Sequence, residues 1–289
     1  MPVKADPVKE LKVRRFDPSV ITLDSTICLI GKRKSGKSAA LKALMYELRD
    51  IPRGIVMSGS EHVNHFFSEF VPGSYIFSEY DPKLLETIFK KQSQRIRRAD
   101  GKKGIENTFF IVMDDMLSDS KAWKNDRQIR ELLMNGRHYG CLCFLTLQYP
   151  LGFGPDLRTN LDYIFIFRET IRANRKRLWE NFAGVIPTFA EFETLMEAIT
   201  VDYNCLVINN NTSSNSLEDI VFYWKAPIDL PKFRVGNRAY WRFHDERFLG
   251  EKQPDEDEDD ALSQAAKILA RYGEDMSMKV IVKSKSGSR

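Results

Sequence analysis

One short stretch of this sequence has the residue types and the spacing needed to bind a chain of phosphates. Residues 31–38 read Gly-Lys-Arg-Lys-Ser-Gly-Lys-Ser and fit the pattern G-x-x-x-x-G-K-[ST]. Glycines let backbone N–H groups turn toward phosphate oxygens, and a helix that starts here adds the positive end of its dipole. Lys37 can reach the β- and γ-phosphates, and the hydroxyl of Ser38 can bind Mg²⁺. The residues predicted to bind ATP are Gly31, Lys32, Arg33, Lys34, Ser35, Gly36, Lys37 and Ser38.

A second candidate for chemistry is the acidic pair Asp114 and Asp115, which directly follows the apolar run 109–113. At the end of a buried strand, Asp114 would hold Mg²⁺ through water, and Asp115 would polarise the water that attacks the γ-phosphate. The alternative is a helix N-cap followed by an acid in the first turn. Because a nucleotide kinase has no need of the second carboxylate, the pair favours an NTPase that hydrolyses its nucleotide.

Three further polar residues are candidates for the same reaction. Gln148 ends the apolar run 141–147 and could sense the γ-phosphate through the attacking water, or could simply be a polar residue at a strand end. Arg137 and Arg158 precede predicted strands. Either could be an arginine finger that acts on the ATP of a neighbouring subunit, and the alternative for each is a surface salt bridge.

The elements that would position these residues are predicted by hydrophobic pattern. Short apolar runs without polar alternation are typical of strands buried on both faces, and helix-patterned segments at 36–48, 81–98 and 126–134 lie between several of them. This alternation predicts an α/β fold, with a mostly parallel sheet flanked by helices. The predicted strands are 25–30, 54–57, 75–77, 109–113, 141–147, 163–167, 205–208 and 220–224.

The chain of 289 residues divides by composition into four parts. Residues 1–20 are predicted to form an extended arm, 21–226 the nucleotide-binding domain, and 227–253 a C-terminal extension of its core. Residues 254–289 are predicted to contain an acidic linker, a short amphipathic helix and a disordered tail.

Composition limits the partners. The net charge is only +4, so any contact with nucleic acid must come from local basic patches. The apolar runs are too short to span a bilayer, and the four cysteines lie in strand-like runs, which predicts reduced core thiols in an intracellular protein without membrane insertion. Two patches could contact DNA phosphates or could be ordinary solvated surface. They are Lys90, Lys91, Arg95, Arg97, Arg98, Lys102 and Lys103, and separately Arg172, Arg175, Lys176 and Arg177.

Over roughly residues 20–226, the chain resembles the genome-packaging ATPases of the nucleocytoplasmic large DNA viruses, including the poxvirus type, which are relatives of the FtsK–HerA DNA translocases. The phosphate loop and the acidic pair contribute to the resemblance, but the most specific part is an ordered series of short blocks. These are Ser58–Glu61 with Asn64, Tyr80 and Gln92, then Asn135–Tyr139, Thr146–Pro150 and Pro155–Tyr163.

The resemblance implies a RecA-like P-loop ATPase of the additional-strand type. It further implies a ring, expected to be hexameric, that pumps double-stranded DNA into a preformed capsid. A capsid or portal-vertex protein would be a partner, and the protein would act in the host-cell cytoplasm at the viral assembly site and be associated with virions. The resemblance supports Gln148 as the sensor and does not choose between Arg137 and Arg158. Lys34 departs from the family, which more often has glycine there.

Two other functions fit the same ATP site. A cellular-type DNA translocase or helicase would share it, and so would a virion-assembly ATP switch or scaffold protein that does not translocate DNA. Stimulation of ATP hydrolysis by linear duplex DNA would favour a motor over a switch.

Overall fold

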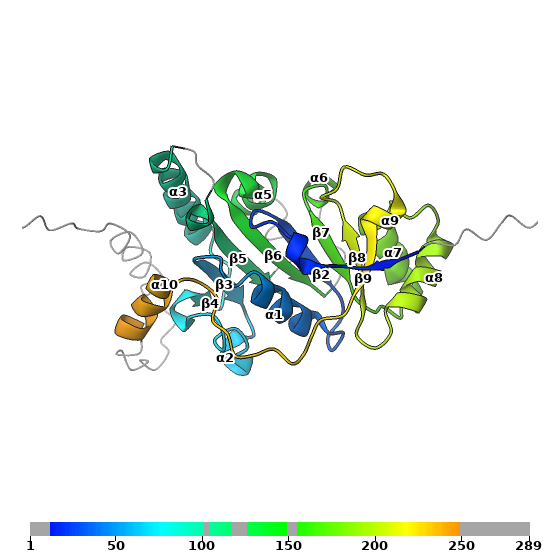
Figure 1. Ribbon diagram of the computed structural model, residues 1–289, viewed down its shortest axis with the longest axis horizontal. Helices are drawn as coiled ribbons and strands as arrows, with labels where there is room; N and C mark the ends of the chain where they lie inside the picture. The colour runs from blue at the N-terminus through cyan, green and yellow to red at the C-terminus, as the bar shows by residue number, and fades with distance from the viewer. Residues whose placement is uncertain (1–11, 101–103, 117–125, 149–154, 249–289) are drawn as a thin grey trace, which may run out of the picture.

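The computed structural model describes residues 12–100, 104–116, 126–148 and 155–248, which are organised around one large sheet (Figure 1). The described part of this sheet has nine strands. From one edge to the other they are β1 (Arg14–Arg15), β9 (Val221–Trp224), β8 (Cys205–Asn209), β7 (Tyr163–Ile166), β2 (Thr26–Ile30), β6 (Cys141–Leu147), β5 (Phe109–Asp114), β3 (Gly54–Ser58) and β4 (Ile76–Phe77).

The sheet is mostly parallel. Among the described strands, only β8 runs antiparallel to both of its neighbours, β7 and β9. β6 lies between β2, which leads into the phosphate loop, and β5, which ends in the acidic pair. That strand order is the additional-strand arrangement, so the predicted fold class is confirmed. Because β2, β6 and β5 are parallel, their carboxyl ends lie side by side. Ligands bind beyond the carboxyl ends of the strands in open α/β sheets.

Helices cover both faces of the sheet (Figure 1). The α-helices are α1 (Lys37–Glu47), α2 (Glu61–Asn64), α3 (Pro82–Arg98), α5 (Arg127–Asn135), α6 (Pro155–Arg158), α7 (Arg172–Phe182), α8 (Phe189–Ile199), α9 (Leu217–Ile220) and α10 (Arg238–Phe243). Short 3-10 helices are η1 (Pro18–Val20), η2 (Gly73–Tyr75), η3 (Ile105–Asn107) and η4 (Gly136–Tyr139), and η5 (His244–Phe248) is a short π-helix.

Two apolar cores lie on opposite faces of the sheet. One core packs α3, α5, α7 and α8 against side chains such as Ile111 and Cys143. The other packs α1 and α10 against side chains such as Val112 and Phe144. Because neighbouring residues of one strand enter different cores, both faces must be apolar, which explains the continuous hydrophobic runs. All four cysteines are free and buried, which confirms the prediction of core thiols.

The ends of the described chain pack against this domain. Arg14 and Arg15 extend the sheet by pairing with β9, and the ring of Phe16 is buried. At the other end, the hydroxyl of Tyr240 on α10 donates to the carbonyl of Gly54 at 2.8 Å. Residues 1–11 and 249–289 lie outside the described residues, and with them the predicted acidic linker, amphipathic helix and tail. In the part described, none of the helices combines the length and apolar character needed to cross a bilayer.

Candidate nucleotide-binding site

The phosphate loop connects the end of β2 to the start of α1, as the sequence predicts. The N–H of Gly31 donates to the carbonyl of Leu147 at 3.0 Å, which ties the loop to β6. A Cβ atom at Gly31 would lie 2.6 Å from Cβ of Phe167, so no larger residue fits without a shift. Gly36 has a φ of +102°, a conformation that side-chain-bearing residues rarely adopt. Both glycines of the pattern are therefore required by the backbone itself.

The middle of the loop is strained and contains a buried hydroxyl. Lys34 has a φ of +60°, in the left-handed region that costs a non-glycine residue about 1–2 kcal/mol. This explains physically why glycine suits the position better. The Oγ of Ser35 is buried and has no hydrogen-bond partner among the described residues. A buried hydroxyl without a hydrogen bond costs about 1–3 kcal/mol, and a phosphate oxygen inside the loop would provide an acceptor.

Lys37 is the first residue of α1 and extends toward the acidic pair. Its Nζ donates to the carbonyl of Leu147 at 3.1 Å. Burial lowers the pKa of Lys37, and the negative charges of Asp115 and Asp114 oppose that shift. The ammonium group therefore lies in a partly desolvated position, where its attraction to a phosphate chain is stronger than it would be in water.

Asp114 is oriented by hydroxyl groups from the strands on both sides. Its Oδ1 accepts a hydrogen bond from Thr146 on β6 at 2.7 Å, and its Oδ2 accepts one from Ser58 on β3 at 3.1 Å. The register pairs Asp114 with both of these residues, so all three lie at the same level of the sheet. Such contacts fix the orientation of a carboxylate that binds a cation.

Asp115 follows in a left-handed conformation with a φ of +54°. Its N–H donates to the Oγ1 of Thr146 at 2.9 Å, and its carboxylate accepts a hydrogen bond from the side-chain amide of Gln148. Burial raises the pKa of Asp115, and the charge of Lys37 and the Gln148 hydrogen bond oppose the shift. The structure thus brings together Lys37, Asp114, Asp115 and Gln148 from three separate segments of the chain.

These residues fit MgATP by their chemistry. The glycine-bounded loop, the unpaired hydroxyl of Ser35 and the ammonium group of Lys37 suit a phosphate chain. The exposed hydroxyl of Ser38 and the oriented carboxylate of Asp114 are the hard oxygen donors that Mg²⁺ prefers. Lys32 and Arg33 are exposed on the same loop, and Lys32 donates to the hydroxyl of Thr170 at 3.2 Å.

Arg137 lies near the amino-terminal end of β6, at the opposite end of the strands from the phosphate loop. It precedes β6 in η4, and its Nη2 donates to Oδ1 of Asp162 at 3.0 Å. The other carboxylate oxygen of Asp162 accepts the N–H of Thr26, the first residue of β2. Because a strand rises about 3.3 Å per residue, Arg137 is about 20 Å from Gln148 at the other end of β6. Arg137 therefore cannot reach the phosphate loop of its own chain.

Arg158 ends the short helix α6, which contacts α5 and α7. The side chain is partly buried, and burial lowers the pKa of Arg158. It makes no ion pair with any residue in the described ranges. In contrast, the side chain of Arg137 is 56% exposed and is held by Asp162. The two candidate arginine fingers thus differ, because Arg137 is exposed and paired with a carboxylate, whereas Arg158 is partly buried and has no ion pair among the described residues.

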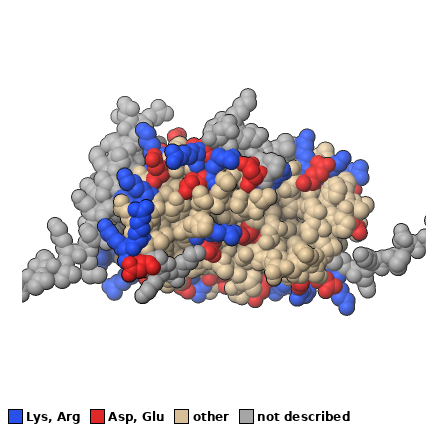
Figure 2. Space-filling model, turned by 90° about the horizontal axis from the view of Figure 1, so that it is seen from above, with Lys and Arg blue, Asp and Glu red and all other residues tan. Residues whose placement is uncertain are grey.

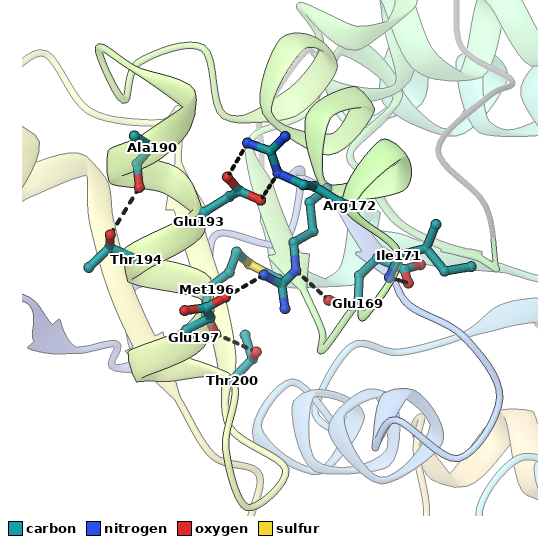
Figure 3. Close-up of polar contacts among 10 residues, drawn as sticks. Glu169, Ile171, Arg172, Ala190, Glu193, Thr194, Met196, Glu197 and Thr200 are labelled. Atoms are coloured by element: carbon teal, nitrogen blue, oxygen red, sulfur yellow. Dashed lines mark hydrogen bonds and ion pairs between the residues drawn. The ribbon is translucent and has the colours of Figure 1, made fainter.

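The two basic patches also differ. Arg95, Arg97 and Arg98 occupy the last turn of α3, and Figure 2 shows Lys and Arg side chains gathered over the end of the molecule where α3 lies. Lys102 and Lys103 lie outside the described residues. In the second patch, Arg172 makes two hydrogen bonds to Glu193 on α8 (Figure 3). Arg175 pairs with Glu197 at 2.8 Å. Acidic residues of α8 thus pair with two of the four cations of this patch, Arg172 and Arg175, which the sequence pattern does not reveal.

Sequence comparison connects the chain to proteins of large DNA viruses. It is 36% identical over 239 residues to an uncharacterised protein of Acanthamoeba polyphaga mimivirus, with 81% of this chain and 84% of the relative covered. It is 40% identical over 221 residues to protein 088R of Invertebrate iridescent virus 3, with 75% of this chain and 82% of the relative covered.

The chain belongs to this viral protein family. A further member is protein 015R of Frog virus 3 (isolate Goorha), which is 32% identical over 255 residues, with 86% of this chain and 77% of the relative covered. No established family model matches the sequence.

Comparison with solved structures shows the fold. The genome packaging NTPase B204 from Sulfolobus turreted icosahedral virus 2, in complex with AMPPCP, superposes with a TM-score of 0.50 at 18% identity and covers 72% of this chain and 100% of its own. The pCW3 conjugation coupling protein TcpA, with ATPγS, superposes with a TM-score of 0.50 at 14% identity and covers 87% of this chain and 66% of its own. At these identities the comparison supports a shared P-loop ATPase fold.

Sequence reasoning did not find every polar residue at this site. Thr146 and Ser58 contact Asp114, and neither was a candidate site residue. The available signal was their place within strands, since a polar residue near the end of an apolar run faces the ligand edge. The proximity of Tyr203 to Gly36 also has no signal in the sequence, because 167 positions separate the two residues.

Proposed function

We propose that this protein is a genome-packaging motor that hydrolyses ATP with Mg²⁺ to translocate double-stranded DNA into a preformed viral capsid. The observation that carries the proposal is the contact between Asp115 and Gln148 beside Lys37. A phosphate loop alone fits many nucleotide-binding proteins, whereas this trio fits one that hydrolyses its nucleotide. Two further supports are the family's occurrence in large DNA viruses and the fold shared with a viral genome packaging NTPase.

In this proposal each residue has a chemical role. Lys37 binds the β- and γ-phosphates, and Ser38 and Asp114 bind Mg²⁺, which supplies positive charge against the phosphate oxygens. Asp115 accepts a proton from the attacking water, and Gln148 orients that water. The raised pKa of Asp115 brings this carboxylate closer to the operating pH, where a general base is most effective.

We further propose that the protein works as a ring with Arg137 as the arginine finger. In a ring, the interface joins two different surfaces of the chain, so a finger acting in trans must lie far from its own phosphate loop. Arg137 meets this requirement because it is exposed at the far edge of the sheet and fixed by Asp162. In this proposal the ring is a hexamer and binds a capsid or portal-vertex protein. The protein acts in the host-cell cytoplasm and is associated with virions.

We also propose a division of the chain into an ATPase unit and flanking segments. Residues 21–226 form the ATPase unit, 227–253 extend its core, and 1–20 and 254–289 are the flanking segments. The exposed basic end of α3 is the surface we propose for sequence-independent contact with DNA phosphates.

The decisive experiment compares ATPase rates with and without linear duplex DNA for the native protein and for Lys37→Ala. The proposal expects magnesium-dependent hydrolysis that DNA stimulates several-fold and that Lys37→Ala abolishes. A rate that DNA does not change would favour the virion-assembly switch instead. Hydrolysis that survives in Lys37→Ala would overturn the site.

A further inference from the structure

An exposed tyrosine lies against the phosphate loop. Tyr203 belongs to the turn between α8 and β8, and the residue is 66% exposed. A methyl group placed on Gly36 would lie 3.5 Å from Cδ1 of Tyr203 and 3.6 Å from its Cβ. Tyr203 therefore lies beside Gly36, with room for about one methyl group between them, while most of its surface faces solvent.

Sheet topology explains how Tyr203 reaches this place. β8 runs antiparallel to β7, and Leu206 near its start pairs with Ile166 at the end of β7. The start of β8 therefore lies at the same edge of the sheet as the phosphate loop. The strand order is β8, β7, β2, β6, β5, so Tyr203 and the acidic pair lie on opposite sides of the loop.

This placement determines what part of a nucleotide Tyr203 would meet. The γ-phosphate must point toward Asp115 and Gln148, which follow β5 and β6. Because the phosphate chain extends away from its γ end, the nucleoside must lie toward β7 and β8. On that side, the turn that contains Tyr203 presents an exposed aromatic ring beside Gly36 of the loop.

The turn is held in a costly conformation. Asp202 and Tyr203 have φ values of +50° and +61°, in the left-handed region where bulky residues are rare. Strain of this kind persists when the surroundings impose it, and it gathers at ligand sites. Here the side chain of Asn204 donates to the carbonyl of Val201 at 2.8 Å, and Asp202 pairs with Lys225.

The helices before the turn are tied to the phosphate loop. On α8, Glu193 and Glu197 bind Arg172 and Arg175 of α7, as the pairs around Glu193 in Figure 3 illustrate. Arg175 also donates to the carbonyl of Glu169, next to the residue that Lys32 contacts. The hydroxyl of Thr200 donates to the carbonyl of Met196, which secures the end of α8. These contacts connect the helices that precede Tyr203 to the segment after β7 that Lys32 of the loop contacts.

We propose that the ring of Tyr203 stacks on the base of the bound nucleotide. This inference rests on the proposed function, because it assigns a second part of the same ATP site. Stacking uses the π-face that every base has, so Tyr203 would add affinity without selecting adenine over guanine. Its role is to bind the nucleoside, and the chemical step remains with Lys37, Asp115 and Gln148.

The test measures dissociation constants by calorimetry for ATP, GTP and inorganic tripolyphosphate, each with Mg²⁺. We expect Tyr203→Ala to weaken both nucleotides by about tenfold and to leave tripolyphosphate unchanged. Tyr203→Phe should bind all three like the native protein, because it keeps the ring. The KM for ATP should rise in Tyr203→Ala while kcat stays the same.

Two controls separate the possible failures. Tyr223→Ala removes a tyrosine from β9, two strands further from β2 than β7, and should not change nucleotide affinity. Lys37→Ala should weaken ATP and tripolyphosphate alike, and if it weakens neither, the ATP site itself is wrong. If Lys37→Ala behaves as expected but Tyr203→Ala leaves the ratio of ATP to tripolyphosphate affinity unchanged, the stacking role alone is refuted.

Discussion

Thr146→Val is the substitution that best tests how the acidic pair is held. The Oγ1 of Thr146 donates to Asp114 at 2.7 Å and accepts the N–H of Asp115 at 2.9 Å, and the residue is only 1% exposed. Valine has nearly the same shape but no hydroxyl. The substitution therefore removes two hydrogen bonds without opening a cavity, and it leaves an N–H and a carboxylate oxygen without their partner.

The magnitude follows from the two bonds. A hydrogen bond to an ionised group contributes about 1.5–3 kcal/mol, and a neutral one contributes about 0.5–1.5 kcal/mol. We expect Thr146→Val to lower the free energy of unfolding by about 2–4 kcal/mol in urea titrations without nucleotide. Thr146→Ser keeps the hydroxyl and loses one buried methyl group, so it should cost only about 1 kcal/mol.

The same variant should also weaken Mg²⁺ binding. Loss of a residue that orients a metal ligand typically reduces metal affinity by about tenfold or more. The Mg²⁺ concentration that gives half-maximal ATPase activity should rise by about that factor in Thr146→Val and stay near native in Thr146→Ser. Either of two results would show that the Thr146 hydroxyl does not hold the acidic pair: Thr146→Ser is the less stable of the two variants, or the Mg²⁺ dependence of Thr146→Val equals that of the native protein.

Further predictions concern the base and the finger. Asp115→Asn should bind ATP but hydrolyse it slowly in single-turnover assays. Because the pKa of Asp115 is raised above 3.8, the stability linked to its protonated form is complete below that value and is lost as the pH rises through the raised pKa. The melting temperature of nucleotide-free Asp115→Asn should therefore exceed that of the native protein increasingly as the pH rises from about 4 through the raised pKa, and a constant difference would contradict this. The finger is tested by mixing Arg137→Ala, and separately Arg158→Ala, with Asp115→Asn. We expect ATPase activity to recover partly in the mixture with Arg137→Ala. Recovery only in the mixture with Arg158→Ala would assign the finger to Arg158.

Sequence alone determined the phosphate loop, the acidic pair and most of the strands. These features depend on residue types at short, fixed spacings, such as the eight residues of 31–38 and the uninterrupted apolar run before Asp114. The observed strand β6 has the predicted bounds of 141–147, and β5 extends one residue beyond its predicted end to include Asp114. A strand buried on both faces must be apolar throughout, so its pattern is readable without knowledge of its neighbours.

Only the tertiary structure decided which side chains meet. The hydroxyls beside Asp114, the carboxylates that neutralise Arg172 and Arg175, and the ring of Tyr203 against Gly36 all come from segments distant in sequence. Their proximity depends on strand order, strand direction and register. Likewise, Arg137 is an arginine near a strand in the sequence, but the direction of β6 places it at the edge away from its own phosphate loop. Strand direction follows from packing of the whole sheet, and no local pattern records it.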